Sequence, residues 1–313
     1  MERTVEEIAS KMDGLGLWET IAPYNWAVCP KGTVFPYFCT AIPEKGSPVK
    51  VRFFMIEGWQ TLHDFVRTRA DPSFGFYSTP MEMSHFELVV VQSGEARLFR
   101  HDPCYLPRPA DERERALCAK MLWESYGFML RLESDRSLPM RYASEKAMFA
   151  RVEGADGKWS DEALAIPDPR PHVEQITFAK ADLAKAKDLP FANEEKIAVD
   201  FAILPGLSTK EPRSRCAYRL LAFDMAAKQP IVSDIVSPAP DGGLRQLWEG
   251  VAPRLLKHLL ARGKVPGEML VRSQRLFRML RPLCLDLPLK LSLRDSIPEL
   301  DQMQISNRKD TTP

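Results

Sequence analysis

The sequence lacks the features by which several classes of protein are usually recognised. Its six cysteines are scattered, with no pair spaced as C-x-x-C, so neither a disulfide framework nor a cysteine-based zinc site is indicated. The five histidines do not cluster with the cysteines. Neither a Walker loop nor G-x-G-x-x-G occurs, so the usual signals for nucleotide and dinucleotide binding are missing. We therefore expect no bound metal and no cofactor.

Long apolar runs and an imbalance of charge are also missing. No stretch has the length and apolar character of a transmembrane helix, and the first residues, Met1-Glu-Arg-Thr-Val-Glu-Glu, are too acidic and polar for a secretory signal. We expect a cytoplasmic protein that does not bind membranes. The chain has 43 basic and 42 acidic side chains, a formal charge of +1. The overall charge therefore argues neither for nor against a nucleic-acid partner.

The length of 313 residues favours two domains. The proline-rich break Pro167-Asp-Pro-Arg-Pro171 marks one candidate boundary, and the charged stretch Lys180–Lys187 marks another. We expect an N-terminal domain over residues 1–170 and a C-terminal domain over residues 171–313.

The clearest structural pattern lies in the last third of the chain. Five short apolar or alternating runs predict strands, at residues 197–204, 217–223, 230–236, 268–272 and 289–293. Leucines at helical spacing predict helices over 244–262 and 274–286, and a last short helix begins near Ile297. The predicted order is βββαβαβα. Because strands linked through helices usually lie parallel, we expect an α/β domain with one mixed sheet and with residues 268–272 buried in it.

This order of elements resembles the ribonuclease H-like fold. Enzymes with that fold hold divalent metal ions with carboxylates on the first strand, at the end of the fourth strand and on the first and last helices. The resemblance places Asp200, Glu249 and Asp301 at three of these positions. The fourth strand, however, ends on Arg272, a cation that would oppose metal binding. The metal site that the resemblance implies is thus incomplete.

The first half of the chain predicts an α+β domain. Candidate strands are Asn25–Cys29, Tyr37–Ile42, Val49–Met55, Phe86–Val91 and Ala96–Phe99, with a hairpin over Arg141–Ala165. Helices are expected near the start of the chain, over Trp59–Arg69 and over Ala110–Leu132.

Two segments carry a further resemblance, to an uncharacterised bacterial family that pairs two domains of unknown function. In the first half it lies in Leu98-Phe-Arg-His-Asp-Pro-Cys-Tyr-Leu-Pro107, where the family has a glycine in place of Cys104. In the second half it lies in Gly263-Lys-Val-Pro-Gly-Glu-Met-Leu-Val-Arg-Ser273, in the Leu-Phe-x-x-Leu-x-Pro-Leu pattern that follows, and in Ile297-Pro-Glu-Leu-Asp301. The resemblance implies no activity.

A basic segment gives the candidate binding surface. Between Arg245 and Arg281 lie nine basic and two acidic residues, a net charge of +7. The candidate binding residues are Arg272, Arg275, Arg278 and Arg281. Clustered arginine is typical of phosphate binding, so the expected partner is nucleic acid or an acidic protein. The alternative is that these arginines form the solvated side of amphipathic helices.

Nucleophilic catalysis has little support. His101 lies close to Cys104 in sequence, and His258 could approach Cys284 in space, but no third, orienting group is evident. We therefore expect a non-enzymatic binding or interaction protein. The alternative is a divalent-metal nuclease or phosphodiesterase, which converging carboxylates around Asp200 would favour. An arginine among those carboxylates would favour the binding module.

Overall fold

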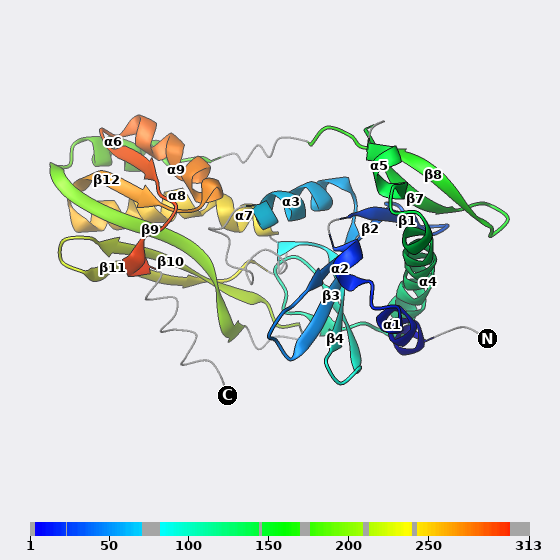
Figure 1. Ribbon diagram of the computed structural model, residues 1–313. Helices are drawn as coiled ribbons and strands as arrows, with labels where there is room; N and C mark the ends of the chain where they lie inside the picture. Colours follow the sequence, from blue (N-terminus) through cyan, green and yellow to red (C-terminus); the bar gives the residue numbers. More distant parts are fainter. Residues whose placement is uncertain are drawn as a thin grey trace. The chain divides into compact units, whose positions relative to one another are not determined.

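The computed structural model describes residues 4–22, 24–70, 82–143, 146–169, 176–208, 213–239 and 243–300 (Figure 1). The described residues form two compact units. The first lies within Met1–Arg67, Met83–Asp102 and Pro107–Arg170, and the second within Thr68–Glu82, Pro103–Leu106 and Pro171–Pro313. Two short segments of the first half thus belong with the second unit. The division of the chain at residue 170 into two independently folding domains stays a prediction.

The first unit contains one large sheet. Its strands are β1 (Trp26–Cys29), β2 (Tyr37–Pro43), β3 (Val49–Glu57), β4 (His85–Val91), β5 (Ala96–His101), β6 (Arg108–Pro109), β7 (Ala147–Glu153) and β8 (Trp159–Ala165). They lie in the order β6-β5-β4-β3-β2-β1-β7-β8. Neighbouring strands are antiparallel except β1 and β7, which are parallel. The five strands predicted before residue 100 are confirmed.

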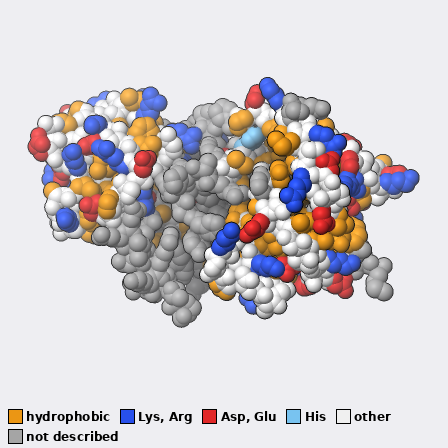
Figure 2. All heavy atoms as spheres, viewed as in Figure 1, with side chains coloured by type: hydrophobic (Ala, Val, Ile, Leu, Met, Phe, Trp, Pro, Cys, Tyr) orange, Lys and Arg blue, Asp and Glu red, His pale blue; other side chains and the backbone are white. Residues whose placement is uncertain are grey.

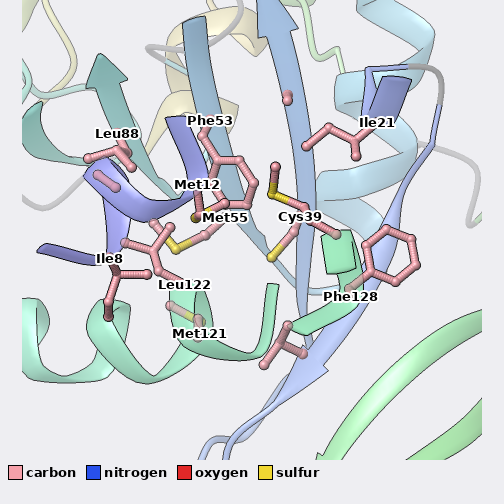
Figure 3. Close-up of a cluster of buried hydrophobic side chains, with 14 of the residues drawn as sticks. Ile8, Met12, Ile21, Cys39, Phe53, Met55, Leu88, Met121, Leu122 and Phe128 are labelled. Atoms are coloured by element: carbon pink, nitrogen blue, oxygen red, sulfur yellow. The ribbon is translucent and has the colours of Figure 1, made fainter. Parts of the chain in front are cut away.

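Helices cover both faces of this sheet. They are α1 (Val5–Gly14), α2 (Trp18–Ile21), α3 (Trp59–Ala70), α4 (Glu112–Ser134) and α5 (Leu138–Ala143). Helices α1 and α4 pack on the face that presents Phe53, Met55 and Leu88, as Figure 3 shows. Helix α3 packs on the other face, against Phe54 and Ile56. The alternation of Phe53 with Phe54 follows from the two-residue period of a strand.

Local signals set the ends of the long helix α4. Asp111 accepts a hydrogen bond from the Glu114 backbone at 2.9 Å, and the Glu114 side chain accepts one from the Asp111 backbone at 2.9 Å. This reciprocal pair satisfies two backbone donors that the first turn leaves unpaired. The hairpin predicted over 141–165 is present from residue 147 onward, but Arg141 lies in α5. That part of the prediction was wrong because α5 packs its buried Leu138 into the core.

The second unit is built on a smaller mixed sheet. Its strands are β9 (Phe191–Ser208), β10 (Cys216–Asp224), β11 (Gln229–Val236), β12 (Val265–Val271) and β13 (Lys290–Leu293). They lie in the order β11-β10-β9-β12-β13, with β10 antiparallel to both neighbours and β12 parallel to both neighbours. All five predicted strands are confirmed. Strand β12 is buried along its whole length, although the middle strand is β9.

Helices α7 (Leu244–Glu249), α8 (Val251–Arg262) and α9 (Gln274–Asp286) pack on one face of this sheet. The single helix predicted over 244–262 is divided at Gly250. Gly263 ends α8 in the left-handed conformation, with φ 74°, and the Ser273 side chain caps α9. The other face packs Ala198 and Leu270 against the segment around Leu300.

The charged stretch proposed as a boundary is also structured. It forms helix α6 (Lys180–Lys187), which packs on α8. Ala186 is buried in the core of the second unit, and Leu183 and Leu189 pack against that core. These apolar contacts explain why the stretch folds as part of the unit despite its three lysines and two aspartates over 180–188.

Candidate functional site

The first candidate position, Asp200, is occupied by an ion pair. Asp200 alternates along β9 with Val199 and Phe201, which face helices α7–α9, so its side chain projects from the opposite face of the sheet. Arg272 follows β12 and donates to the Asp200 carboxylate at 2.8 Å. Both side chains are 10% exposed. A positive charge thus occupies the place where the resemblance requires a metal ligand.

The other two carboxylates do not complete a site among the described residues. Glu249 is on α7, which packs on the other face of the sheet, and it accepts from Arg245 at 2.8 Å. Asp301 lies outside the described residues. Within the described part of the chain, Asp200 and Glu249 belong to no group of three potential metal ligands. Arg272 is thus a neighbour that the structure places beside Asp200.

Arg275, a candidate phosphate ligand, is held in a buried polar cluster. Its guanidinium donates to Glu82 at 2.7 Å and lies 4.0 Å from the centre of the Trp248 ring. The Trp248 indole donates to the same carboxylate at 3.2 Å. Burial raises the pKa of Glu82 despite these donors. Arg275 therefore acts as the counterion of a buried glutamate, with a cation–π contact on one side.

Four exposed cations of the basic segment have no ion pair with a described residue. Arg254 and Lys257 lie one turn apart on α8, and Arg278 and Arg281 lie one turn apart on α9. The two helices contact each other, and their buried faces point toward the sheet. No ion pair joins any of the four to another described residue. Elsewhere, acidic and basic side chains are interspersed, as the face in Figure 2 shows.

The remaining cations of the segment are bound to carboxylates. Arg262 and Lys264 both contact Glu195, the latter at 3.0 Å, and Arg262 also lies 3.6 Å from Asp224. Arg245 is paired with Glu249. The net charge of the segment thus overstates the charge available to a partner, because carboxylates from other elements neutralise much of it.

The cysteines show no sign of activation. Burial raises the pKa of the Cys104 thiol to about 11 and that of Cys284 to about 12, so both are protonated near neutral pH. His258 is bound instead to Asp234, at 2.6 Å. His258 also lines an open pocket of about 380 Å³ whose walls are mostly apolar. A cysteine–histidine nucleophile has no support from these contacts.

A buried cluster in the first unit was missed by the sequence analysis. His85 and Glu87 on β4 and His101 on β5 each offer a potential metal-ligating atom, and these atoms lie within 4.8 Å of one another. All three residues are buried. A signal was available, because a hairpin turned at Ser93-Gly94 pairs residue 85 with residue 101. Histidines were sought beside cysteines and were not compared across the neighbouring candidate strands.

Comparisons with known proteins identify one domain. A family model described as a domain of unknown function (DUF6930) matches residues 182–306. The match covers most of the second unit and supports the resemblance stated for that half of the chain. No curated protein matches the sequence. Among the described residues, none of the helices has both the length and the apolar character needed to cross a membrane.

Proposed function

We propose that the second unit is a non-catalytic module that binds the phosphate backbone of a nucleic acid. The observation that carries the proposal is the group of exposed cations on the neighbouring helices α8 and α9. These residues, called the α8–α9 cations below, are Arg254, Lys257, Arg278 and Arg281. Arginine and lysine in such numbers, without carboxylates beside them, are the electrostatic feature of phosphate binding.

The composition of the two helices supports this choice. Helix α8 has no acidic residue, and the acidic residue of α9 is Asp286 in its last position, which lies 3.7 Å from Lys187. Stacking aromatics are not among the exposed residues of either helix. Binding would therefore depend on phosphate contacts with little base readout, and sequence preference should be weak.

The same proposal includes a ribonuclease H-like topology without catalysis. The strand order β11-β10-β9-β12-β13, with β10 antiparallel to its neighbours, supports that topology. The ion pair of Asp200 with Arg272 supports the absence of a metal-dependent nuclease, since a fixed cation raises the cost of a nearby divalent ion. We expect no degradation of single-stranded, duplex or hybrid substrates with Mg²⁺ or Mn²⁺. Degradation that Asp200→Asn abolishes would instead favour the nuclease.

The test is fluorescence anisotropy with labelled single-stranded DNA, duplex DNA and RNA over a range of salt concentrations. Each phosphate contact to duplex DNA contributes about 0.9 to the slope of log affinity against log salt, so four contacts predict a slope of about −3.6. Replacement of the four α8–α9 cations with Gln should reduce the slope to nearly zero. The fold should be unchanged, because the substituted side chains are exposed.

A matched control removes four exposed cations from the first unit. The control residues are Arg113, Lys120, Arg136 and Lys158. This variant has the same net charge as the first and should keep the parental slope. Equal slopes for the parent and the α8–α9 variant would contradict the proposal, as would an absence of binding at low salt. If the chain binds an acidic protein and no nucleic acid, the α8–α9 cations are a binding surface but the proposed partner is wrong.

A further inference from the structure

His85, Glu87 and His101 form a compact group on one face of the first sheet. His85 lies directly opposite His101 in the β4–β5 pair, and Glu87 follows two residues after His85 on the same face. The imidazole rings are stacked, with centroids 4.2 Å apart and planes 16° apart. The Phe54 ring lies 5.6 Å from His85, on the side of the sheet that α3 covers. The group is therefore placed by the strand register within an apolar layer.

The hydrogen bonds identify which nitrogen lone pairs are available. His85 Nδ1 lies 3.1 Å from the carbonyl oxygen of Met83, which can only accept, so Nδ1 carries the proton. Nε2 of His85 then carries a lone pair, and this nitrogen has no hydrogen-bond partner in the described structure. His101 Nε2 lies 2.7 Å from Glu87, and His101 Nδ1 likewise lacks a partner. A buried nitrogen without a partner is unfavourable unless a ligand satisfies it.

The potential ligands are held by hydrogen bonds of the kind found around metal-binding side chains. Metal-binding histidines usually donate their other ring N–H to a backbone carbonyl or a carboxylate, and His85 donates to the Met83 carbonyl in this way. Glu87 is itself fixed by Arg52, whose guanidinium donates to it at 2.6 Å and to Glu44 at 2.5 Å.

We propose that His85, Glu87 and His101 bind one divalent transition-metal ion. Two imidazoles and one carboxylate are a set of ligands that suits zinc, cobalt and nickel, and three protein ligands leave a position for water or another ligand. His85 contributes Nε2, Glu87 a carboxylate oxygen and His101 a ring nitrogen. Magnesium and calcium are not expected, because they require ligand sets made of oxygen.

Binding requires a small rearrangement of the rings. Ligand atoms on one tetrahedral zinc ion lie about 3.3 Å apart, given bonds of about 2.0 Å. The corresponding atoms here lie within 4.8 Å, and the two imidazole rings are stacked. Rotation of the imidazoles about their side-chain bonds, without movement of the strands, brings the lone pairs together. Loading with a metal ion should therefore separate the stacked rings.

The experiment is a cobalt titration of the full-length chain after removal of metals with a chelator. We expect one Co²⁺ per chain, visible absorption of a four- or five-coordinate ion, and competition by Zn²⁺. Excess Zn²⁺ should also raise the Tm, because an ion that binds only the folded chain stabilises it. His101→Gln and His85→Gln should each weaken Co²⁺ binding at least about a hundredfold, since each removes a direct ligand.

The matched control is His258→Gln, which removes a histidine that is bound to a carboxylate but has no second histidine beside it. This variant should bind Co²⁺ as tightly as the parent. Circular dichroism shows whether each variant folds. If the variant of the buried His85 does not fold, the Co²⁺ titration of the parent still tests the proposal. The proposal is overturned by the absence of saturable one-to-one binding in the parent. It is equally overturned by a thiolate-to-cobalt absorption band or by unchanged affinity in His101→Gln.

Discussion

Cys104 has a backbone conformation that side chains rarely adopt. Its φ is 74°, in the left-handed region where glycine is favoured, and the resemblance stated for this segment implies a glycine here. The residue is held there by its carbonyl, which accepts from the backbone of Cys216 at 2.8 Å. The thiol is buried, 4% exposed, so packing offsets part of the conformational cost. The resemblance and the backbone angle therefore have the same physical explanation.

Cys104→Gly should leave the free energy of unfolding within about 1 kcal/mol of the parent. Relief of the left-handed conformation, about 1–2 kcal/mol, should balance the lost burial of a small side chain. Cys216→Gly is the control, because Cys216 is fully buried in β10 and its removal should cost about 2 kcal/mol or more. Urea denaturation measures both. Equal losses in the two variants would contradict the conformational argument.

The ion pair between Asp200 and Arg272 is buried, so substitution of either partner removes a charge–charge interaction from the interior. Arg272→Met and Asp200→Leu should each destabilise the chain by about 3–5 kcal/mol. The double variant should cost much less than the sum, because both substitutions remove the same interaction. A double-mutant cycle measured in urea tests this coupling. Strictly additive losses would show that the pair contributes no such interaction.

At the level of elements, the pairing of β9 with β12 depends on a glycine. A Cβ atom at Gly267 would lie 1.9 Å from the carbonyl oxygen of Asn193, at the point where the register of the two strands shifts. Backbone atoms cannot yield as a flexible side chain does. Gly267 therefore permits the close approach that places β12 between β9 and β13.

Gly267→Ala should destabilise the second unit by at least about 3 kcal/mol, since the clash is with the backbone of a central strand. Gly127→Ala is the control: Gly127 lies within α4 with open space around it, and alanine should stabilise that helix by about 0.5–1 kcal/mol. Differential scanning calorimetry compares the two. If Gly267→Ala leaves the stability unchanged, β9 and β12 can move apart at this point without loss of free energy.

Considered as a whole molecule, the chain does not divide cleanly at one peptide bond. Glu82 and residues 103–106 belong to the second unit although they precede residue 170. Leu106 donates to the carbonyl of Ser214 at 3.0 Å, and Glu82 binds Arg275. A fragment that begins at residue 171 would thus lack parts of its own core. The sequence predicts that brief proteolysis cuts first in the region of the proline-rich break 167–171 and the charged stretch 180–187.

The isolated fragment 171–313 should have a lower Tm than the second unit in the full chain. Within the fragment, Arg275 has lost Glu82, so Arg275→Met should change the Tm little or raise it. In the full chain the same substitution should cost about 3–5 kcal/mol, because it leaves Glu82 buried without its counterion. Thermal unfolding of the four proteins measures this. If Arg275→Met lowers the Tm equally in the fragment and in the full chain, the effect of the substitution does not depend on Glu82.

Local patterns in the sequence were sufficient to predict most of the elements. The strands and helices of the second unit follow from apolar runs, leucine spacing and the caps at Gly263 and Ser273, all of which act between residues close in sequence. The arginine at the end of β12 was also evident, and with it the doubt about a metal site beside Asp200.

Only the tertiary structure decided which charges are available. Arg272 and Asp200 are 72 residues apart in sequence, and Arg275 and Glu82 are 193 apart, so no local pattern indicates that either arginine is neutralised. The cluster of His85, Glu87 and His101 depends on the register of a hairpin, which fixes which side chains face each other. Periodicity is a property of neighbouring residues and predicts elements. Pairing of buried charges is a property of the folded chain, because it depends on which elements pack together.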